Sequence, residues 1–372
     1  MTRSAPPAPA ALLRHDWVDI AKGIGIVLVV FGHVWRGLHA AGLPIGEAQF
    51  ALVDSGVYAF HMPLFFCLSG LFFHDSLLKR GPAGLMASKV DSLVWPYLVW
   101  SLLQGAVEVA LSHWTNGKTS PGQVLALWEP RAQFWFLYAL FLSCALGCLA
   151  YARLRREEAA WMLPSALLLY AIAGNLTDPS VIDQTMTYFA FFALGAALRP
   201  AEAALQRRWA WLFGPVLVAA VAAAVAGQLL FHVRLGLNYR SVGGAAFALA
   251  AVCVLAVLLL SVGLSRWGGP IGGVLRRLGA ASMPIYLMHI LAGSGTRILL
   301  ARGLQVDDVA VQALVGTLAG LGLPMGAHAL LLRAGLGGLF TPPRWASVQA
   351  VWARRRCAAP ALAAGRAGPS GQ

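Results

Sequence analysis

Ten apolar runs of about 15 to 24 residues constrain this chain more than any other feature. A helix needs about 20 apolar residues to cross a bilayer, and fewer indicate soft boundaries. The runs lie at 17–37, 52–73, 91–112, 134–151, 159–174, 184–198, 210–231, 242–264, 282–300 and 309–332. Because lipid cannot satisfy backbone hydrogen bonds, they predict an all-α, polytopic integral membrane bundle of about ten transmembrane helices.

Composition and the two ends of the chain agree with this fold class. Of 372 residues, 59% are hydrophobic and only 12% charged, whereas soluble domains are near 25% charged. Residues 1–16 are expected to be a disordered cytoplasmic tail, not a signal peptide. Residues 17–337 form the predicted transmembrane domain, and 338–372 a basic, disordered cytoplasmic tail.

The distribution of positive charge predicts the orientation. One set of alternate loops, with both termini, carries 20 Lys and Arg, and the opposite loops carry six. The positive-inside rule therefore places both termini in the cytoplasm of a multi-pass protein of the cytoplasmic, or inner, membrane. The net charge of +13 follows these loops, so nucleic acid is not expected as a partner. No His/Cys/Asp cluster has metal-ligand spacing, so no metal is predicted.

The first run, DIAKGIGIVLVVFGH, carries three ionisable groups within an apolar helix. Lys22 and His33 are eleven residues apart, which is three turns plus about 20°, and Asp19 lies about 40° from His33. The three side chains therefore form one stripe, about 16 Å long between Lys22 and His33. Ionisable groups inside spans usually face a cavity that serves chemistry or transport.

Polar residues in the second and ninth runs extend this candidate site. His61 lies in a wholly apolar segment, which favours a functional or site-supporting role, and Pro63 is expected to bend the same helix. Ser69 and Gly70 are small enough to allow close helix approach. In the ninth run, polar residues recur at spacings of four and three and so share one face. They are Ser282, Tyr286 and His289.

Three further positions have two interpretations each. Glu108 shares a face with Gln104 and either belongs to the site or reaches water at the outer end of its span. Trp135 and Tyr138 either belong to an interfacial aromatic belt or wall a sugar or cofactor site. His232 and His328 are expected to be structural.

Four motifs in order resemble those of the integral-membrane acyltransferase 3 family, in particular its fucose 4-O-acetylase-like branch. They are DIAKGIGIVLVVFGH, FHMPLFFCLSGLFF, QFWFLYALF and LGAASMPIYLMHI, spread from residue 19 to 289. Lys22 and His33 fit the family's basic residue, ten positions and histidine. Much of the broader family has Arg where this chain has Lys22, so a bidentate fork is replaced by a point charge.

The resemblance implies transfer of an acyl group, usually acetyl from acetyl-CoA, to a hydroxyl of a cell-surface or lipid-linked carbohydrate. In that reaction His33 suits the general base, since a sugar hydroxyl is a poor nucleophile. Lys22 would hold a CoA phosphate or the thioester end, or pair with Asp19. Alternatively, Asp19 stabilises the N-terminus of the helix as an acidic residue in its first turn. Ser69 is a candidate oxyanion donor. The candidate substrate- or cofactor-binding residues are His61, Ser69, Glu108, Trp135, Tyr138, Ser282, Tyr286 and His289.

The expected partners are acyl-CoA, a carbohydrate acceptor and the bilayer, and acetyl-CoA is a co-substrate and not a tightly bound cofactor. CoA is expected from the cytoplasm, and the acceptor from the external side or the lipid. Two other functions stay open: a transporter or flippase using the Asp19, Lys22 and His33 stripe as a relay, and a scaffold subunit of a polysaccharide-export complex. The sequence also leaves the oligomeric state open, a homo-oligomer included.

Overall fold

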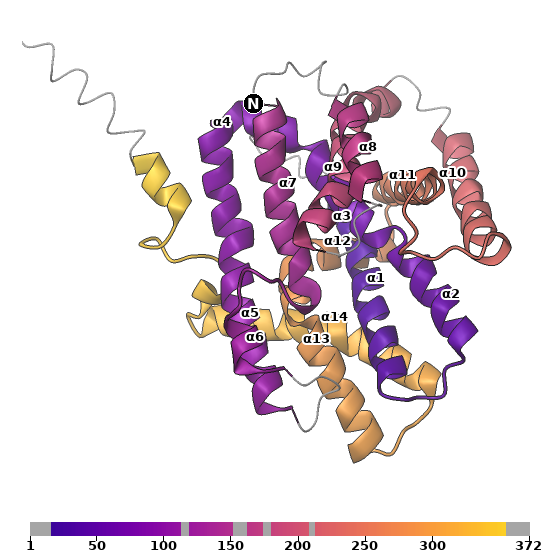
Figure 1. Ribbon diagram of the computed structural model, residues 1–372, viewed down its shortest axis with the longest axis vertical. Helices are drawn as coiled ribbons and strands as arrows, with labels where there is room; N and C mark the ends of the chain where they lie inside the picture. Colours follow the sequence, from indigo (N-terminus) through magenta and orange to yellow (C-terminus); the bar gives the residue numbers. More distant parts are fainter. Residues whose placement is uncertain (1–15, 113–118, 152–161, 174–179, 208–212, 355–372) are drawn as a thin grey trace, which may run out of the picture.

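A computed structural model describes residues 16–112, 119–151, 162–173, 180–207 and 213–354. These residues form helices and connecting turns, without a strand among them, which confirms the all-α prediction (Figure 1). Eight helical runs in this part of the chain are long and apolar enough to cross a membrane. The other two predicted spans correspond to the short α8 and to α13.

Most of the helices coincide with the predicted runs, whereas α4, α6 and α12 lie in segments between them. Their bounds are α1 (Asp16–Ala40), α2 (Glu47–Tyr58), α3 (His61–Leu71), α4 (Phe73–Lys89), α5 (Trp95–Ala110), α6 (Pro121–Leu125), α7 (Trp135–Tyr151), α8 (Met162–Ala173), α9 (Val181–Arg207), α10 (Phe213–Gln228), α11 (Gly244–Trp267), α12 (Pro270–Ala280), α13 (Ser282–Ile298) and α14 (Val309–Arg333).

Helix α1 lies at the centre of the packing and contacts α3, α11, α12, α13 and α14. Its contact with α12 brings two backbones together, since a Cβ added to Gly279 would overlap the carbonyl oxygen of Asp19. Gly23 meets the Leu275 carbonyl in the same way. In Figure 1, α14 runs across α13 and α1. The site residues of α1 are therefore enclosed by the last three helices of the chain.

The second predicted span is broken between α2 and α3, at Phe60, whose φ of −139° and ψ of −15° are not helical. Pro63 follows three residues later, as expected for a span that bends. His61 begins α3, and its Nδ1 lies 2.8 Å from the carbonyl oxygen of Val57. Farther along α3, Gly70 meets the Phe192 carbonyl of α9, which confirms the predicted close helix approach.

The segment 74–90, between the second and third predicted spans, is helical and is not the loop that the charge count implies there. Helix α4 continues through a π-helical segment, Val90–Val94, into α5, so that one helical run extends over Phe73–Ala110. Gly81, with a φ of 70°, interrupts α4 just before Pro82. The charged residues here lie on a helix that extends past the apolar part of the span.

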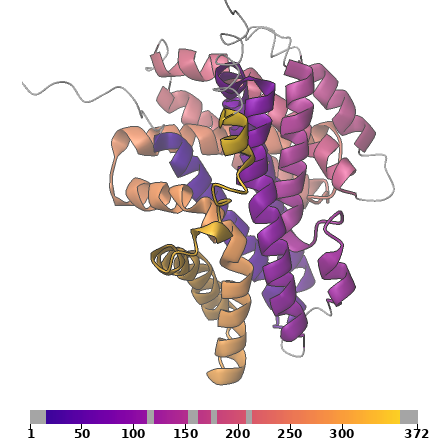
Figure 2. The same ribbon diagram turned by 90° about the vertical axis from the view of Figure 1, so that its left-hand side faces the viewer.

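Residues 338–354 differ from the disordered tail expected there. Figure 2 shows this segment along α4 and α5. Trp95 and Trp100 donate side-chain hydrogen bonds to the carbonyls of Gly338 and Leu339. Ser347 donates to Asp91 at 2.6 Å. Two indole groups of α5 and the carboxylate of Asp91 in the π-helical segment thus form hydrogen bonds with the tail. Composition alone does not reveal these contacts. Residues 1–15 and 355–372 lie outside the described part.

Candidate functional site

An inner cavity of about 300 Å³ collects four of the predicted site residues. Lys22 on α1 and Ser69 on α3 line it together with two residues of α13, Ser282 and Tyr286. Apolar side chains, including Phe136 of α7, form the remaining wall. The predicted stripe on the ninth run is therefore placed in a cavity, where its first two residues meet residues from the first two spans.

A second cavity of about 230 Å³ continues from the inner one toward the face predicted to be cytoplasmic. The two share Lys22, Phe65 and Ser69, and the second extends to Lys89 at the end of α4. Lys22 is 38% exposed and its Nζ lies 3.7 Å from Asp19 Oδ1. Asp19 itself is buried at the α1–α12 crossing. The second cavity thus has a lysine at each end, Lys22 where it meets the inner cavity and Lys89 at the other end.

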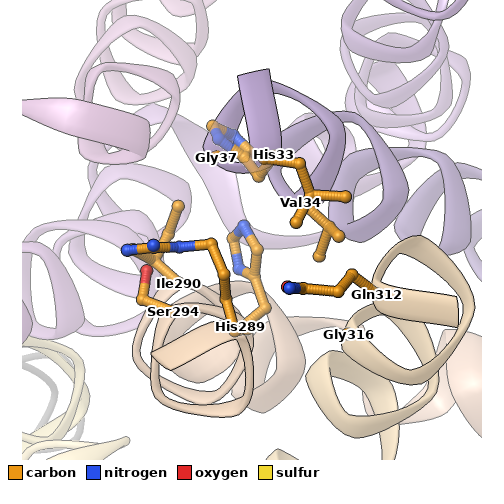
Figure 3. Close-up of a pocket in the computed structure, with 11 residues that line it drawn as sticks. His33, Val34, Gly37, His289, Ile290, Ser294, Gln312 and Gly316 are labelled. Atoms are coloured by element: carbon orange, nitrogen blue, oxygen red, sulfur yellow. The ribbon is translucent and has the colours of Figure 1, made fainter. Parts of the chain in front are cut away.

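An outer cavity of about 30 Å³ lies between α1, α13 and α14 (Figure 3). His33 and His289 both line it, and their ring centroids are 5.0 Å apart. Lys22 and His33 share the inward stripe of α1 as predicted, but they line different cavities. Val30, between them on the stripe, is fully buried and lines neither cavity.

The tautomer of His289 follows from its backbone contacts. Its Nδ1 lies 2.7 Å from the carbonyl oxygen of Tyr286 and 3.2 Å from that of Ile285. Because a carbonyl oxygen only accepts, Nδ1 carries the hydrogen, and Nε2 of the neutral ring keeps its lone pair. Nε2 is buried and has no hydrogen-bond partner in the described part of the chain. His289 therefore offers a fixed proton acceptor beside His33.

A chain of hydrogen bonds leads from Tyr286 to Glu108. Tyr286 donates a hydrogen bond to the backbone carbonyl of Gln133, and the side chain of Gln133 donates to Gln104 at 2.7 Å. Gln104 donates to Glu108 at 2.8 Å. Glu108 also accepts from Arg131 at 2.9 Å. Glu108 thus supports Tyr286 through this chain and is paired, and neither cavity with Lys22 or His33 includes it.

The remaining predicted residues, Trp135, Tyr138 and His61, line none of these three cavities. Trp135 packs against Tyr188, with ring centroids 5.2 Å apart. Tyr138 packs against Tyr97 at 5.5 Å and lines a separate cavity of about 220 Å³. His61 is buried against Tyr58, whose ring lies 6.1 Å from that of His33. Tyr58 therefore connects His61 to His33. Trp135 and Tyr138, the two aromatic residues of α7, lie beside the site.

Sequence reasoning missed several polar residues that the fold brings to the site. The outer cavity also contains Ser294, Arg297 and Gln312. Gln133 is the buried link between Tyr286 and Gln104. Each is one polar residue within or beside an apolar run. The only available signal was its location inside a predicted span, which many structural glutamines and serines share.

The chain matches the acyltransferase 3 family, described as an acyltransferase domain, over residues 15–328. It belongs to that family. The match covers nearly all of the described helices, so the family assignment applies to the multi-pass helical bundle as a whole.

Two curated relatives are similar over about half of the chain. The nodulation protein NolL of Mesorhizobium japonicum is 25% identical over 209 residues, which cover 55% of this chain and 54% of that protein. NolL of Sinorhizobium fredii is 28% identical over 188 residues, or 49% and 48%. The chain thus spans about half the length of the curated relatives it matches. No solved structure matches it significantly.

Proposed function

We propose that this acyltransferase moves an acyl group, in the simplest case acetyl from acetyl-CoA, to a hydroxyl of a cell-surface or lipid-linked carbohydrate. The observation that carries the proposal is the pair of cavities on α1 and α13. They end about one helical turn apart, since Tyr286 lines the inner cavity and His289 the outer one. Two substrates entering from opposite sides would meet there.

The inner cavity suits the donor. Lys89 and Lys22 follow one another along the inner route, and ammonium groups are good partners for the phosphates of CoA. Beyond Lys22 the lining is mainly apolar, which fits the acyl thioester and the pantetheine arm. Ser69 also lines this cavity, and its hydroxyl would donate a hydrogen bond to the thioester oxygen as negative charge develops on it.

The imidazole pair supplies the proton transfer. His33 takes the proton of the acceptor hydroxyl as its oxygen attacks the thioester carbon, and the C–S bond then breaks. The CoA thiolate leaves with that proton, which regenerates neutral His33. The lone pair on Nε2 of His289 stabilises the His33 imidazolium while it exists. For the two cavities to join, Tyr286 and the valines of α1 must open a passage of about one turn.

The carbohydrate acceptor and the location belong to the same proposal. The similarity of the four motifs to the fucose 4-O-acetylase-like branch supports a sugar hydroxyl as acceptor. The 20-to-6 charge bias supports a protein of the cytoplasmic membrane with both termini inside. The donor cavity then opens toward the cytoplasm, where acyl-CoA is available, and the outer cavity toward the external side.

The test is acetyl transfer in purified membranes. Labelled acetyl-CoA is incubated with membranes containing the wild-type protein or His33→Ala, and label is measured in glycan and as free acetate. Incorporation by the wild type alone supports the proposal. Retained transfer by His33→Ala removes the imidazole from the mechanism. Solute flux without CoA, together with no label transfer, would favour the transporter instead.

A further inference from the structure

Gln312 presents a buried acceptor atom that the chemistry above does not use. It lies in the first turn of α14 and is 1% exposed. The turn is capped by Asp308, whose side chain accepts from the Val311 N–H at 2.8 Å. The Gln312 N–H donates to the Asp308 carbonyl at 3.0 Å. The backbone of Gln312 is therefore held in one place.

The orientation of its amide is also fixed. Nε2 donates to the carbonyl oxygen of Val306 at 2.7 Å. A flipped amide would put two oxygens in contact, so Oε1 must point the other way. Oε1 is buried and has no hydrogen-bond partner among residues 16–354 where the structure describes them. Figure 3 shows the amide reaching toward His289 in the outer cavity.

Most buried amide oxygens have a hydrogen-bond donor, and one from outside the protein would satisfy Gln312 Oε1. The outer cavity, at about 30 Å³, has room for one or two waters or hydroxyl groups but not for a sugar ring. His33, His289 and Gln312, from three different helices, all line it. Gly37, at the same cavity, leaves open space beside α1.

We infer that Gln312 is a specificity-determining residue that accepts a hydrogen bond from a second hydroxyl of the acceptor, next to the hydroxyl that His33 deprotonates. The acceptor is thus a vicinal diol, whose two hydroxyls fill the outer cavity while its ring stays at the mouth near Gly37. This inference rests on the proposed function. A water that attacks the thioester needs no second contact of this kind, so hydrolysis should not depend on Gln312.

The test is the ratio of acetyl transfer to surface glycan over acetyl-CoA hydrolysis to free acetate, measured with labelled acetyl-CoA in native membranes. The ratio does not depend on how much protein is folded. Gln312→Met removes Oε1 and Gln312→Asn withdraws it by one methylene, so both should lower the ratio by about tenfold to a hundredfold. Gln49→Met, at an exposed position on α2, should leave it unchanged.

Two results overturn the inference. An unchanged ratio in both Gln312 variants means that Oε1 binds a water only. A parallel loss of transfer and hydrolysis in both means that Gln312 supports the fold or the common chemistry. Failure of the proposed function is seen separately, as a wild type that neither transfers nor hydrolyses, or as His33→Ala with wild-type transfer.

Discussion

The rings of His33 and His289 lie 5.0 Å apart, one on the first helix and the other on α13. The contact exists because α13 packs along α1, and both imidazoles line the outer cavity. If the pair acts as one unit, His33→Ala and His289→Ala should each lower acetyl transfer by about 10²- to 10⁴-fold. The double variant should lose little more than either single one.

Acetyl transfer from labelled acetyl-CoA, normalised to folded protein, measures these losses. His39→Ala is the matched control, because His39 lies on the same helix, two turns farther out, and pairs with the exposed Glu47. Strictly additive losses would contradict the unit, since they would mean that the two imidazoles act in separate steps.

Lys22 should act on the donor alone. Lys22→Ala should raise KM for acetyl-CoA by about tenfold with a smaller change in kcat, because a phosphate contact made in both ground and transition state is lost. The effect should shrink at high salt. Lys22→Arg should keep KM for acetyl-CoA close to the wild-type value, since the positive charge is kept. Steady-state kinetics check this, with Lys79→Ala, exposed on α4, as the control. A change confined to kcat would place Lys22 in the chemistry instead.

The helical period was sufficient to predict which residues share a face. It put Ser282, Tyr286 and His289 on one stripe of α13, and Lys22 and His33 on one stripe of α1. The period could not show that His33 and His289 are neighbours, because that depends on which helices pack together. Nor could it show that the stripe of α1 serves two cavities, since this depends on which residues of α3, α13 and α14 pack around it.

The length of α4 and the order of the C-terminal segment were also beyond sequence reasoning. Charged residues between two apolar runs predict a loop. In α4 the helix nevertheless continues through them, with an interruption at Gly81 and Pro82. The segment after Gly338 is Arg-, Ala- and Pro-rich, a composition that indicates disorder, yet Asp91 and two tryptophans of α5 supply its hydrogen-bond partners. Such tertiary contacts leave no local pattern.

Gly37 gives a steric test of the outer cavity. A Cβ added there meets no atom within 4 Å, so Gly37→Leu should fold normally and extend its side chain into the cavity mouth. Glycan acetylation should then fall at least tenfold, whereas binding of acetyl-CoA should change little. Gly322→Leu is the control, because Gly322 is exposed on α14 and also has open space. Normal acetylation by Gly37→Leu would mean that the acceptor enters elsewhere.

The crossing of α1 and α12 should limit stability. A methyl group at Gly279 would overlap the Asp19 carbonyl, and both atoms belong to backbones that cannot rotate away. Gly279→Ala should therefore force the helices apart and lower the free energy of unfolding by about 1–3 kcal/mol. Gly273→Ala, on the same helix with nothing within 4 Å, should be neutral or slightly stabilising, since Ala favours helix. Thermal unfolding in detergent separates the two. Equal unfolding temperatures would show that the crossing relaxes without loss of stability. Acetyl transfer by Gly279→Ala would then show whether Lys22, one turn along α1 from Asp19, keeps its position.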